Sequence, residues 1–327
     1  MAAGTSHHDV GMHAACAGVL MKACGIFLLL AVILYHDYGR KQYQGQLLES
    51  RESKYNSIFI YKNGDLISMT FGHNKRIFTE SIYDTKDDRE LPGVYTRFMA
   101  VPVAYDNDVV NILEIGLGGG RTAWYLHKFL PETQVTSVEL DPDVVALAKK
   151  YFGVHEEPNF DVIVDDGRMF LKNNIRSYDV ILIDAYRAAF VPFHLLTKEF
   201  YEVVKSHLKP GGIVALNVEP TTILFDAAVV TVKAVFQNVD LYFAEGNVMI
   251  VAYDGPPRSE ADLMASANQK QVRFGFKYSL PDMVSQRQVL AQLPKAQVLT
   301  DDFAPVESLK AIERHNQKLD SLTAQAK

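Results

Sequence analysis

The stretch that decides the fold runs from Asn111 to Asp141 and reads NILEIGLGGGRTAWYLHKFLPETQVTSVELD. An apolar strand at Val109–Ile115 leads through a glycine-rich turn into a helical segment, Thr122–Leu130, and then into a second strand, Val135–Glu139. A strand, a tight turn, a helix and a further strand in this order form one unit of a parallel sheet covered by helices. The stretch therefore predicts an α/β fold of the Rossmann-like type.

The same alternation continues along the chain as far as Tyr253. We expect further strands at Phe160–Val164, Val180–Ile183 and Ile213–Val218, helices at Pro142–Phe152, Met169–Asn173, Phe200–Leu208 and Phe225–Phe236, and two closing antiparallel strands at Val239–Phe243 and Asn247–Tyr253. Helices between successive parallel strands cover both faces of the sheet. The predicted fold class is a doubly wound α/β sheet of the class I methyltransferase type.

The glycine turn predicts a site for an adenosyl cofactor. Glycines between a strand and a helix let backbone N–H groups approach a ligand closely, and the candidate positions are Gly116, Gly118 and Gly120. A dinucleotide-binding turn reads GxGxxG, but Arg121 occupies the place of its last glycine. The GxGxG form found here is typical of adenosyl-cofactor transferases, which bind no pyrophosphate, and it disfavours a nicotinamide-dependent dehydrogenase.

Two acidic positions complete the predicted cofactor site. Glu139 ends the next strand, where a carboxylate can accept hydrogen bonds from both ribose hydroxyls. Asp166 and Gly167 follow the third strand, where a carboxylate can accept a hydrogen bond from the amino group of adenine. A solvated acid at the end of a strand explains either position alone. Together, at the carboxyl ends of consecutive strands, they favour a binding site.

Composition and charge exclude several other classes. The net charge of -6 and the absence of a lysine or arginine cluster argue against a nucleic-acid partner. The only cysteines, Cys16 and Cys24, lie in the N-terminal apolar stretch, so the rest of the chain has no thiol for a disulfide or a metal. The histidines show no metal-ligand spacing, and we expect no metal site.

The N-terminal stretch from Ala14 to Tyr35 is apolar apart from Lys22. That length just suffices for a membrane-spanning helix if the lysine reaches an interface. A cleaved signal peptide and a buried helix are the alternatives, although no small-residue cleavage pattern follows. The basic residues after the stretch favour a single-pass membrane protein with a cytoplasmic catalytic domain.

The predicted organisation has six parts. A tail at residues 1–13 precedes the membrane anchor at 14–35 and a polar linker at 36–52. A small antiparallel β unit at 53–91 contains a hairpin signal, because Asn63–Gly64 suits a type I′ turn. The Rossmann-like catalytic domain covers 92–255 and begins with a helix at Pro92–Tyr105, and the remainder, 256–327, is a polar, helical tail.

Several motifs in combination resemble the spermidine synthase (polyamine aminopropyltransferase) family, and in particular its membrane-associated, spermidine-synthase-like branch. The matching run extends from about Tyr55 to Tyr253. It includes the hairpin and the segments Ile112–Gly120, Val138–Pro142, Asp166–Leu171, Tyr178–Asp184, Leu196–Tyr201 and Leu208–Gly212. The N-terminal β unit and the Leu196–Tyr201 segment are the features that separate this family from generic methyltransferases.

The resemblance implies transfer of an aminopropyl group from decarboxylated S-adenosylmethionine to a small amine acceptor, as in polyamine biosynthesis. Displacement at a sulfonium needs a neutral amine in line with the leaving group, and a nearby carboxylate can take its proton. Asp184 matches the first acid of the family's DSSDP-like segment, which implies a role as catalytic base or substrate anchor. The resemblance also implies a homodimer.

Three positions depart from the family pattern. The acid of the family's glycine loop, which faces the amine end of the cofactor, is Gly119 here, and the second acid of the DSSDP-like segment is Arg187. The family's Tyr-x-Glu appears as Tyr95-Thr-Arg97, so Tyr95, Arg97 and Arg187 are candidate substrate contacts. A guanidinium would repel a cationic amine and attract an anion.

These departures leave two alternatives to aminopropyl transfer. The first is methyl transfer from intact S-adenosylmethionine to an anionic acceptor. This alternative gains weight because a glycine in place of the loop acid also removes repulsion from the carboxylate of the intact cofactor. The second is a membrane-tethered binding protein without catalysis.

Overall fold

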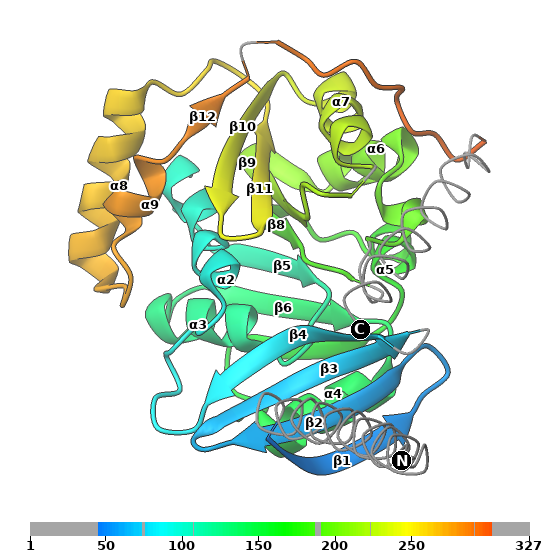
Figure 1. Cartoon of the computed structure of the whole chain (residues 1–327). Coiled ribbons are helices and arrows are strands. Elements are labelled where there is room, and N and C mark those ends of the chain that lie inside the picture. Colours follow the sequence, from blue (N-terminus) through cyan, green and yellow to red (C-terminus); the bar gives the residue numbers. More distant parts are fainter. Residues whose placement is uncertain are drawn as a thin grey trace, which may run out of the picture.

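The computed structural model describes residues 45–73, 76–106, 108–186, 191–222, 224–290 and 292–302. Two sheets organise these residues: a large sheet of eight strands and a small sheet of four. Figure 1 shows the small sheet beside the part of the large sheet that contains β6, with the helix α4 next to it. The architecture matches the class I methyltransferase-type α/β fold that the sequence predicts.

The large sheet has the strand order β12-β10-β11-β9-β8-β5-β6-β7. Strands β9, β8, β5, β6 and β7 pair in parallel, whereas β11 joins β9 antiparallel and β10 and β12 continue antiparallel beyond it. The bounds are β5 Asn111–Ile115, β6 Gln134–Glu139, β7 Phe160–Val164, β8 Tyr178–Ile183, β9 Leu208–Val218, β10 Asn238–Ala244, β11 Asn247–Tyr253 and β12 Gln288–Val289. The antiparallel closing pair was predicted from the sequence and is confirmed.

Alternate residues of the central strands enter opposite cores, which is why residues 180–183 of β8 are all apolar. In β8, Val180 and Leu182 belong to one core and Ile181 and Ile183 to the other. One core includes residues of α2, α3, α8 and α9, and the other includes residues of α5, α6 and α7. The helices are α2 Val94–Phe98, α3 Arg121–Phe129, α4 Pro142–Tyr151, α5 Gly167–Asn173, α6 Lys198–Ser206, α7 Phe225–Val235, α8 Glu260–Phe274 and α9 Leu280–Val284.

The small sheet is antiparallel, in the order β1-β2-β3-β4. Its strands are β1 Gln46–Glu52, β2 Ser57–Asn63, β3 Leu66–His73 and β4 Arg76–Asp84. The predicted β2–β3 hairpin is present, but it turns at Gly64–Asp65, because Asn63 still pairs with Leu66. Only Gly64, with φ 60°, has a positive φ there, so the turn is not the type I′ turn that the Asn-Gly pair predicts. Ile58 and Met69 of this sheet share a core with Leu147 of α4. This packing fixes β4 relative to the parallel sheet.

Two boundaries differ from the prediction. Residues 46–52, expected to be linker, form β1. Pairing with β2 satisfies the backbone hydrogen-bonding groups of this strand, whereas its polar sequence shows little of the apolar periodicity that would predict a strand. The expected helix Pro92–Tyr105 divides into α2 and a 3₁₀ helix, η1 Val101–Tyr105, with Pro102 near the start of the second part. Proline lacks the N–H that a continuous α-helix needs at that position. A second 3₁₀ turn, η2 Phe193–Leu195, precedes α6.

The predicted membrane anchor at residues 14–35 lies outside the described residues. Within the described ranges, no helix is long and apolar enough to span a membrane. The longest helix there, α8, has 15 residues, whereas a span needs about 20 apolar ones. The predicted single-pass membrane localisation with a cytoplasmic catalytic domain is therefore corrected.

Candidate active site

The glycine turn between β5 and α3 is closed tightly against the end of β8. The Gly116 amide donates to the Val138 carbonyl at 2.8 Å, and Gly116 has φ 96°. A Cβ at this position would lie 2.5 Å from the backbone oxygen of Asp184. Gly118, with φ 53°, is different, because a Cβ there would meet only the Glu80 carbonyl, at 4.0 Å. The turn is thus packed on one side and open on the other.

The space beside the Cα of Gly119 is filled by the small sheet and by Phe152. A Cβ on Gly119 would overlap the Ser81 side chain of β4 and would lie 2.6 Å from a ring carbon of Phe152. Real Cβ atoms do not approach other heavy atoms so closely. The position at which the family has an acid therefore has no room for a side chain in this protein.

Gly119→Asp is expected to destabilise the protein by about 1–3 kcal/mol, because the added atoms must displace Ser81 and Phe152. Chemical denaturation of the two proteins measures the change. Gly119→Ala should have a smaller effect in the same direction. Equal stability of the wild type and the aspartate variant would contradict the packing described here.

Glu139 ends β6 and binds the backbone of the turn. Its Oε2 accepts from the Leu117 amide at 2.9 Å and from the Gly118 amide at 3.4 Å, and its Oε1 accepts from the Asp141 amide at 3.0 Å. Burial raises the pKa of the Glu139 carboxyl, and the hydrogen bonds from these amides act against that rise. An ionised carboxylate has further lone pairs, so these bonds leave capacity for ribose hydroxyls.

Asp166 caps α5 by accepting from the Met169 amide at 2.9 Å. Its second oxygen faces His194 Nε2 at 3.1 Å, and this hydrogen bond lowers the pKa of Asp166 against the effect of burial. Arg168 extends the network, because it donates to the His194 carbonyl at 3.1 Å and forms an ion pair with Asp301. A C-terminal residue thus takes part in positioning the predicted adenine contact.

Gly167 follows Asp166 at the start of α5. A Cβ on Gly167 would overlap the side chain of Ile115 in β5. The glycine is therefore needed for close packing of the helix on the sheet. Contact with the cofactor stays a prediction.

Asp184 follows β8 directly, and its amide donates to the Ile115 carbonyl at 2.9 Å. Its Oδ1 accepts from Asn217 Nδ2 at 2.8 Å, and Asn217 in turn accepts from Asn247 Nδ2 at 3.0 Å. Burial raises the pKa of Asp184 to about 6, and the amide of Asn217 acts in the opposite direction. A carboxylate with this pKa is suited to accept a proton near neutral pH.

Two further carboxylates, which the sequence motifs did not reveal, share this region with Asp184 and Glu139. Glu114 is buried in β5 and accepts from Ser137 Oγ at 2.6 Å. Glu80 is on β4, and its Oε1 is buried without a hydrogen-bond partner among the described residues. Burial raises the pKa of both groups well above the usual value, and the charges of Asp184 and Glu139 raise them further.

Two tyrosines also line this acidic region. The Tyr95 hydroxyl donates to the Glu80 carbonyl at 3.4 Å, and the Tyr186 hydroxyl donates to the Asn217 carbonyl at 3.2 Å. Burial raises the pKa of both phenols, with the Asp184 charge as the next cause. Tyr95, a predicted substrate contact, therefore lies with the acids.

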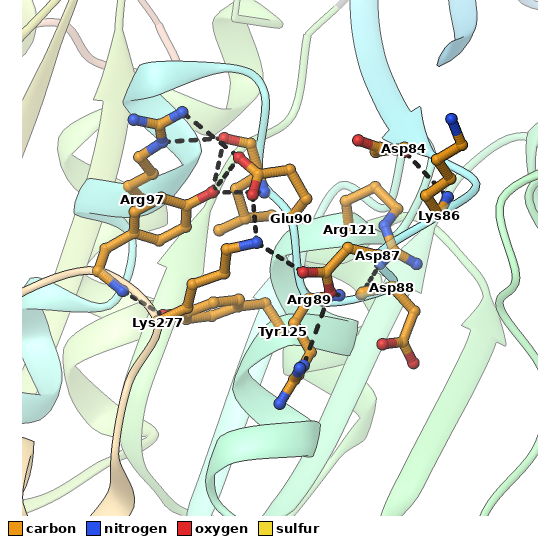
Figure 2. Close-up of polar contacts among 12 residues, drawn as sticks. Asp84, Lys86, Asp87, Asp88, Arg89, Glu90, Arg97, Arg121, Tyr125 and Lys277 are labelled. Atoms are coloured by element: carbon orange, nitrogen blue, oxygen red, sulfur yellow. Dashed lines mark hydrogen bonds and ion pairs between the residues drawn. The ribbon is translucent and has the colours of Figure 1, made fainter. Parts of the chain in front are cut away.

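Arg97 lies in a different cluster, between the β4–α2 loop and the C-terminal segment. Its Nε donates to the Leu91 carbonyl at 2.9 Å, and its guanidinium lies 4.3 Å from the centre of the Tyr278 ring. Figure 2 shows Arg97 beside Glu90 and Lys277. The guanidinium is thus already engaged by protein groups. Arg187, the other predicted cationic contact, lies outside the described residues.

Among the residues that the structure describes, no cluster of three or more His, Cys, Asp or Glu side chains is arranged to hold a metal ion. The turn amides, Glu139 and Asp166 lie together at the carboxyl ends of parallel strands, where we predicted the adenosyl-cofactor site. The additional acids bring four carboxyl groups together in the region around Asp184, and burial and mutual repulsion raise the pKa of Glu80 and Glu114.

Comparison with known proteins agrees with this geometry. Residues 94–252 match the family model described as the spermine/spermidine synthase domain. A polyamine aminopropyltransferase of Vibrio vulnificus (strain CMCP6) is 28% identical over 282 residues, which cover 82% of this chain and 92% of that protein. One of Chromobacterium violaceum is 30% identical over 228 residues, which cover 68% of this chain and 86% of that protein.

A solved structure shares the fold. The spermidine synthase of Thermotoga maritima superposes with a TM-score of 0.60 at 22% identity, and the match covers 73% of this chain and 83% of that one. The matches to polyamine aminopropyltransferases identify the chain as a transferase that uses an adenosyl-type cofactor. More narrowly, the chain belongs to the spermine/spermidine synthase family, as its motifs predicted.

Proposed function

We propose that this chain transfers an aminopropyl group from decarboxylated S-adenosylmethionine to a small primary amine. The observation that carries the proposal is the group of carboxylates around Asp184, formed with Glu80, Glu114 and Glu139. Such a site attracts a cationic ligand. Both the aminopropyl end of the decarboxylated cofactor and an amine acceptor are cationic in water.

The described residues fit the cofactor. The open side of Gly118 allows a ligand to approach the turn closely, because a Cβ added there would meet only the Glu80 carbonyl, at 4.0 Å. Glu139 would accept from the ribose hydroxyls, and Asp166 would accept from the amino group of adenine. Asp166 already bonds His194 at 3.1 Å, so adenine would share or replace that contact.

When bound, the cofactor would supply a three-carbon chain whose carbon next to the sulfonium sulfur is activated toward attack by a nitrogen. Asp184 takes a proton from the acceptor ammonium and leaves a neutral nitrogen with a free electron pair. A nitrogen–carbon bond then forms as the carbon–sulfur bond breaks, and the electron pair of the broken bond stays on sulfur as a neutral thioether. Asn217 keeps the Asp184 carboxylate oriented through its bond of 2.8 Å.

Methyl transfer from intact S-adenosylmethionine is the weaker candidate. The intact cofactor carries a carboxylate, which the ionised members of this group of acids would repel. An anionic acceptor was considered because Arg97 could bind it. The Arg97 guanidinium, however, is engaged with the Leu91 carbonyl and the Tyr278 ring. The sterically closed Gly119 explains the missing loop acid without a change of cofactor.

Calorimetry with the two cofactors tests this choice. The decarboxylated form should bind at least about 10-fold more tightly than the intact form, because only the intact form brings a carboxylate into the acidic site. A turnover assay with putrescine as the acceptor should then release methylthioadenosine. Tighter binding of intact S-adenosylmethionine would reject aminopropyl transfer.

The pH dependence of turnover tests the base. Because Asp184 must be ionised to accept a proton, kcat should fall as the pH drops through the pKa of about 6. Asn217→Leu removes the donor that lowers this pKa, so the acidic limb should move to higher pH. We expect kcat at pH 6 to fall by about 2–10-fold while kcat at pH 8.5 changes by less than about 2-fold. A limb that stays in place or moves to lower pH would argue against Asp184 as the base.

A further inference from the structure

Glu80 lies directly over the glycine turn, although it belongs to the small sheet. Its carbonyl would be 4.0 Å from a Cβ on Gly118, and the next residue, Ser81, fills the space beside Gly119. The Tyr95 hydroxyl donates to the same carbonyl at 3.4 Å. These contacts place β4 against the turn at the point where that turn carries no side chain of its own.

Glu80 differs from its acidic neighbours in what its carboxylate binds. The Glu139 carboxylate accepts hydrogen bonds from three backbone amides. The Asp184 carboxylate accepts one from the side-chain amide of Asn217, and the Glu114 carboxylate accepts one from the Ser137 hydroxyl. Glu80 Oε1 is buried, and no described residue donates to it. A buried acceptor without a donor costs about 1–3 kcal/mol, and more if it is charged, so such a group in a site is best explained by a ligand that donates to it.

The surroundings of Glu80 specify the charge of that ligand. Asp184 and Glu139 act electrostatically on Glu80 and oppose its ionisation. A primary alkylammonium group carries one positive charge and three N–H donors, so it satisfies the unpaired oxygen and offsets the repulsion. A neutral donor would satisfy only the first need.

We propose that Glu80 binds the primary ammonium group at the end of the cofactor's aminopropyl chain, in place of the acid that Gly119 cannot carry. The assignment to the cofactor follows from the backbone of Glu80 beside Gly118 and from the interaction of its carboxyl group with Asp184 and Glu139, and it rests on the proposed aminopropyl transfer. The small sheet then contributes directly to cofactor selection, because Glu80 favours the decarboxylated cofactor and repels the carboxylate of the intact one.

Binding of two ligands to Glu80→Gln tests this role. Decarboxylated S-adenosylmethionine has the ammonium group, whereas methylthioadenosine has the same adenosine part without it. The variant should bind the first ligand at least about 10-fold more weakly and the second within about 2-fold of the wild type. Glu156→Gln, which removes an equal charge at an exposed position paired with Lys149, should leave both affinities unchanged.

Two further measurements separate a binding role from a structural one. Loss of an unpaired buried carboxylate should leave the melting temperature of the ligand-free protein unchanged or higher. Glu80→Asp, which keeps the charge on a shorter side chain, should recover part of the affinity for the decarboxylated cofactor. A lower melting temperature together with equal weakening of both ligands would assign Glu80 to the scaffold and overturn the proposal.

The other possible results of the Glu80→Gln experiment also distinguish between the proposals. If Glu80→Gln raises only the KM for the diamine, the ammonium group belongs to the acceptor and the assignment to the cofactor is overturned. Wild-type affinity of the variant for both ligands would overturn the role of Glu80 but leave aminopropyl transfer standing. If the wild type binds neither ligand, the proposed function itself fails, and the role of Glu80 fails with it.

Discussion

Replacing Asp184 with asparagine is expected to lower kcat by about 10²–10⁴-fold, the range that a positioned general base contributes. The asparagine amide has the shape of the carboxylate but cannot take a proton from the acceptor. The effect should fall on turnover, because Asp184 lies at the end of β8, beyond the amides that bind Glu139. The affinity for methylthioadenosine should stay within about 3-fold of the wild type.

Single-turnover rates and ligand affinities measured on the same preparations test this expectation. Asp161→Asn is a matched control, because Asp161 is exposed on β7 and accepts only from Gln134 among its side-chain contacts in the described part of the chain. It should be indistinguishable from the wild type. An Asp184→Asn variant with turnover within about 10-fold of the wild type would remove Asp184 from the chemistry, since a general base gives at least about 10²-fold.

The cofactor half of the site follows closely from the sequence because its parts are local. Strand, glycine turn and helix are consecutive, and Glu139 ends the next strand of the same parallel unit, so topology alone brings it to the turn. Asp166 is reached by one further parallel step, between β6 and β7. The roles of these residues as ligand contacts stay predictions.

Glu80 could not be found in this way, because its position depends on tertiary packing. It lies on an antiparallel strand that precedes the catalytic domain, and it reaches the turn only because Ile58, Met69 and their neighbours pack on α4. The sequence predicts a small antiparallel β unit at 53–91 but not the face of the parallel sheet that its strand β4 covers. The sequence shows that Gly119 stands where the family has an acid, whereas the structural reason, the Ser81 side chain, lies far away in the chain on another sheet.

Arg97 lies away from the acids, although the sequence motif placed it next to Tyr95. Its neighbour in the Tyr95-Thr-Arg97 motif does lie with the acids, so the motif position alone suggested a shared site. Residues two apart on a helix do not face the same way, and α2 turns the guanidinium toward Leu91 and Tyr278. A motif thus located the helix but not the direction of each side chain.

Alanine substitutions at Gly116 and Gly118 of the glycine turn should have large but different effects, the first on stability and the second on ligand affinity. Gly116→Ala is expected to destabilise the protein by about 2–5 kcal/mol, from the strain at φ 96° together with a Cβ only 2.5 Å from the Asp184 oxygen. The clashing atoms are backbone, so no side-chain rotation can relieve the contact. Any folded fraction would carry a displaced Asp184, and a shift of about 1 Å can cost 10²-fold in rate.

Gly118→Ala should keep the fold and lose the ligand. At φ 53° an alanine costs about 1–2 kcal/mol, but its Cβ enters open space beside the turn, 4.0 Å from the nearest atom. That space is the one into which the proposed cofactor must fit, so affinity for methylthioadenosine should fall by about 10-fold or more.

The pair is measured by chemical denaturation and by calorimetry with methylthioadenosine. Gly116→Ala should shift the denaturation midpoint far more than Gly118→Ala does. Gly118→Ala, in contrast, should lose affinity for methylthioadenosine while it loses little stability. If Gly118→Ala bound the ligand as tightly as the wild type, the open side of the turn would not face the cofactor. A mild effect of Gly116→Ala on both stability and turnover would mean that the end of β8 can move, and Asp184 would then not be held in place by the turn.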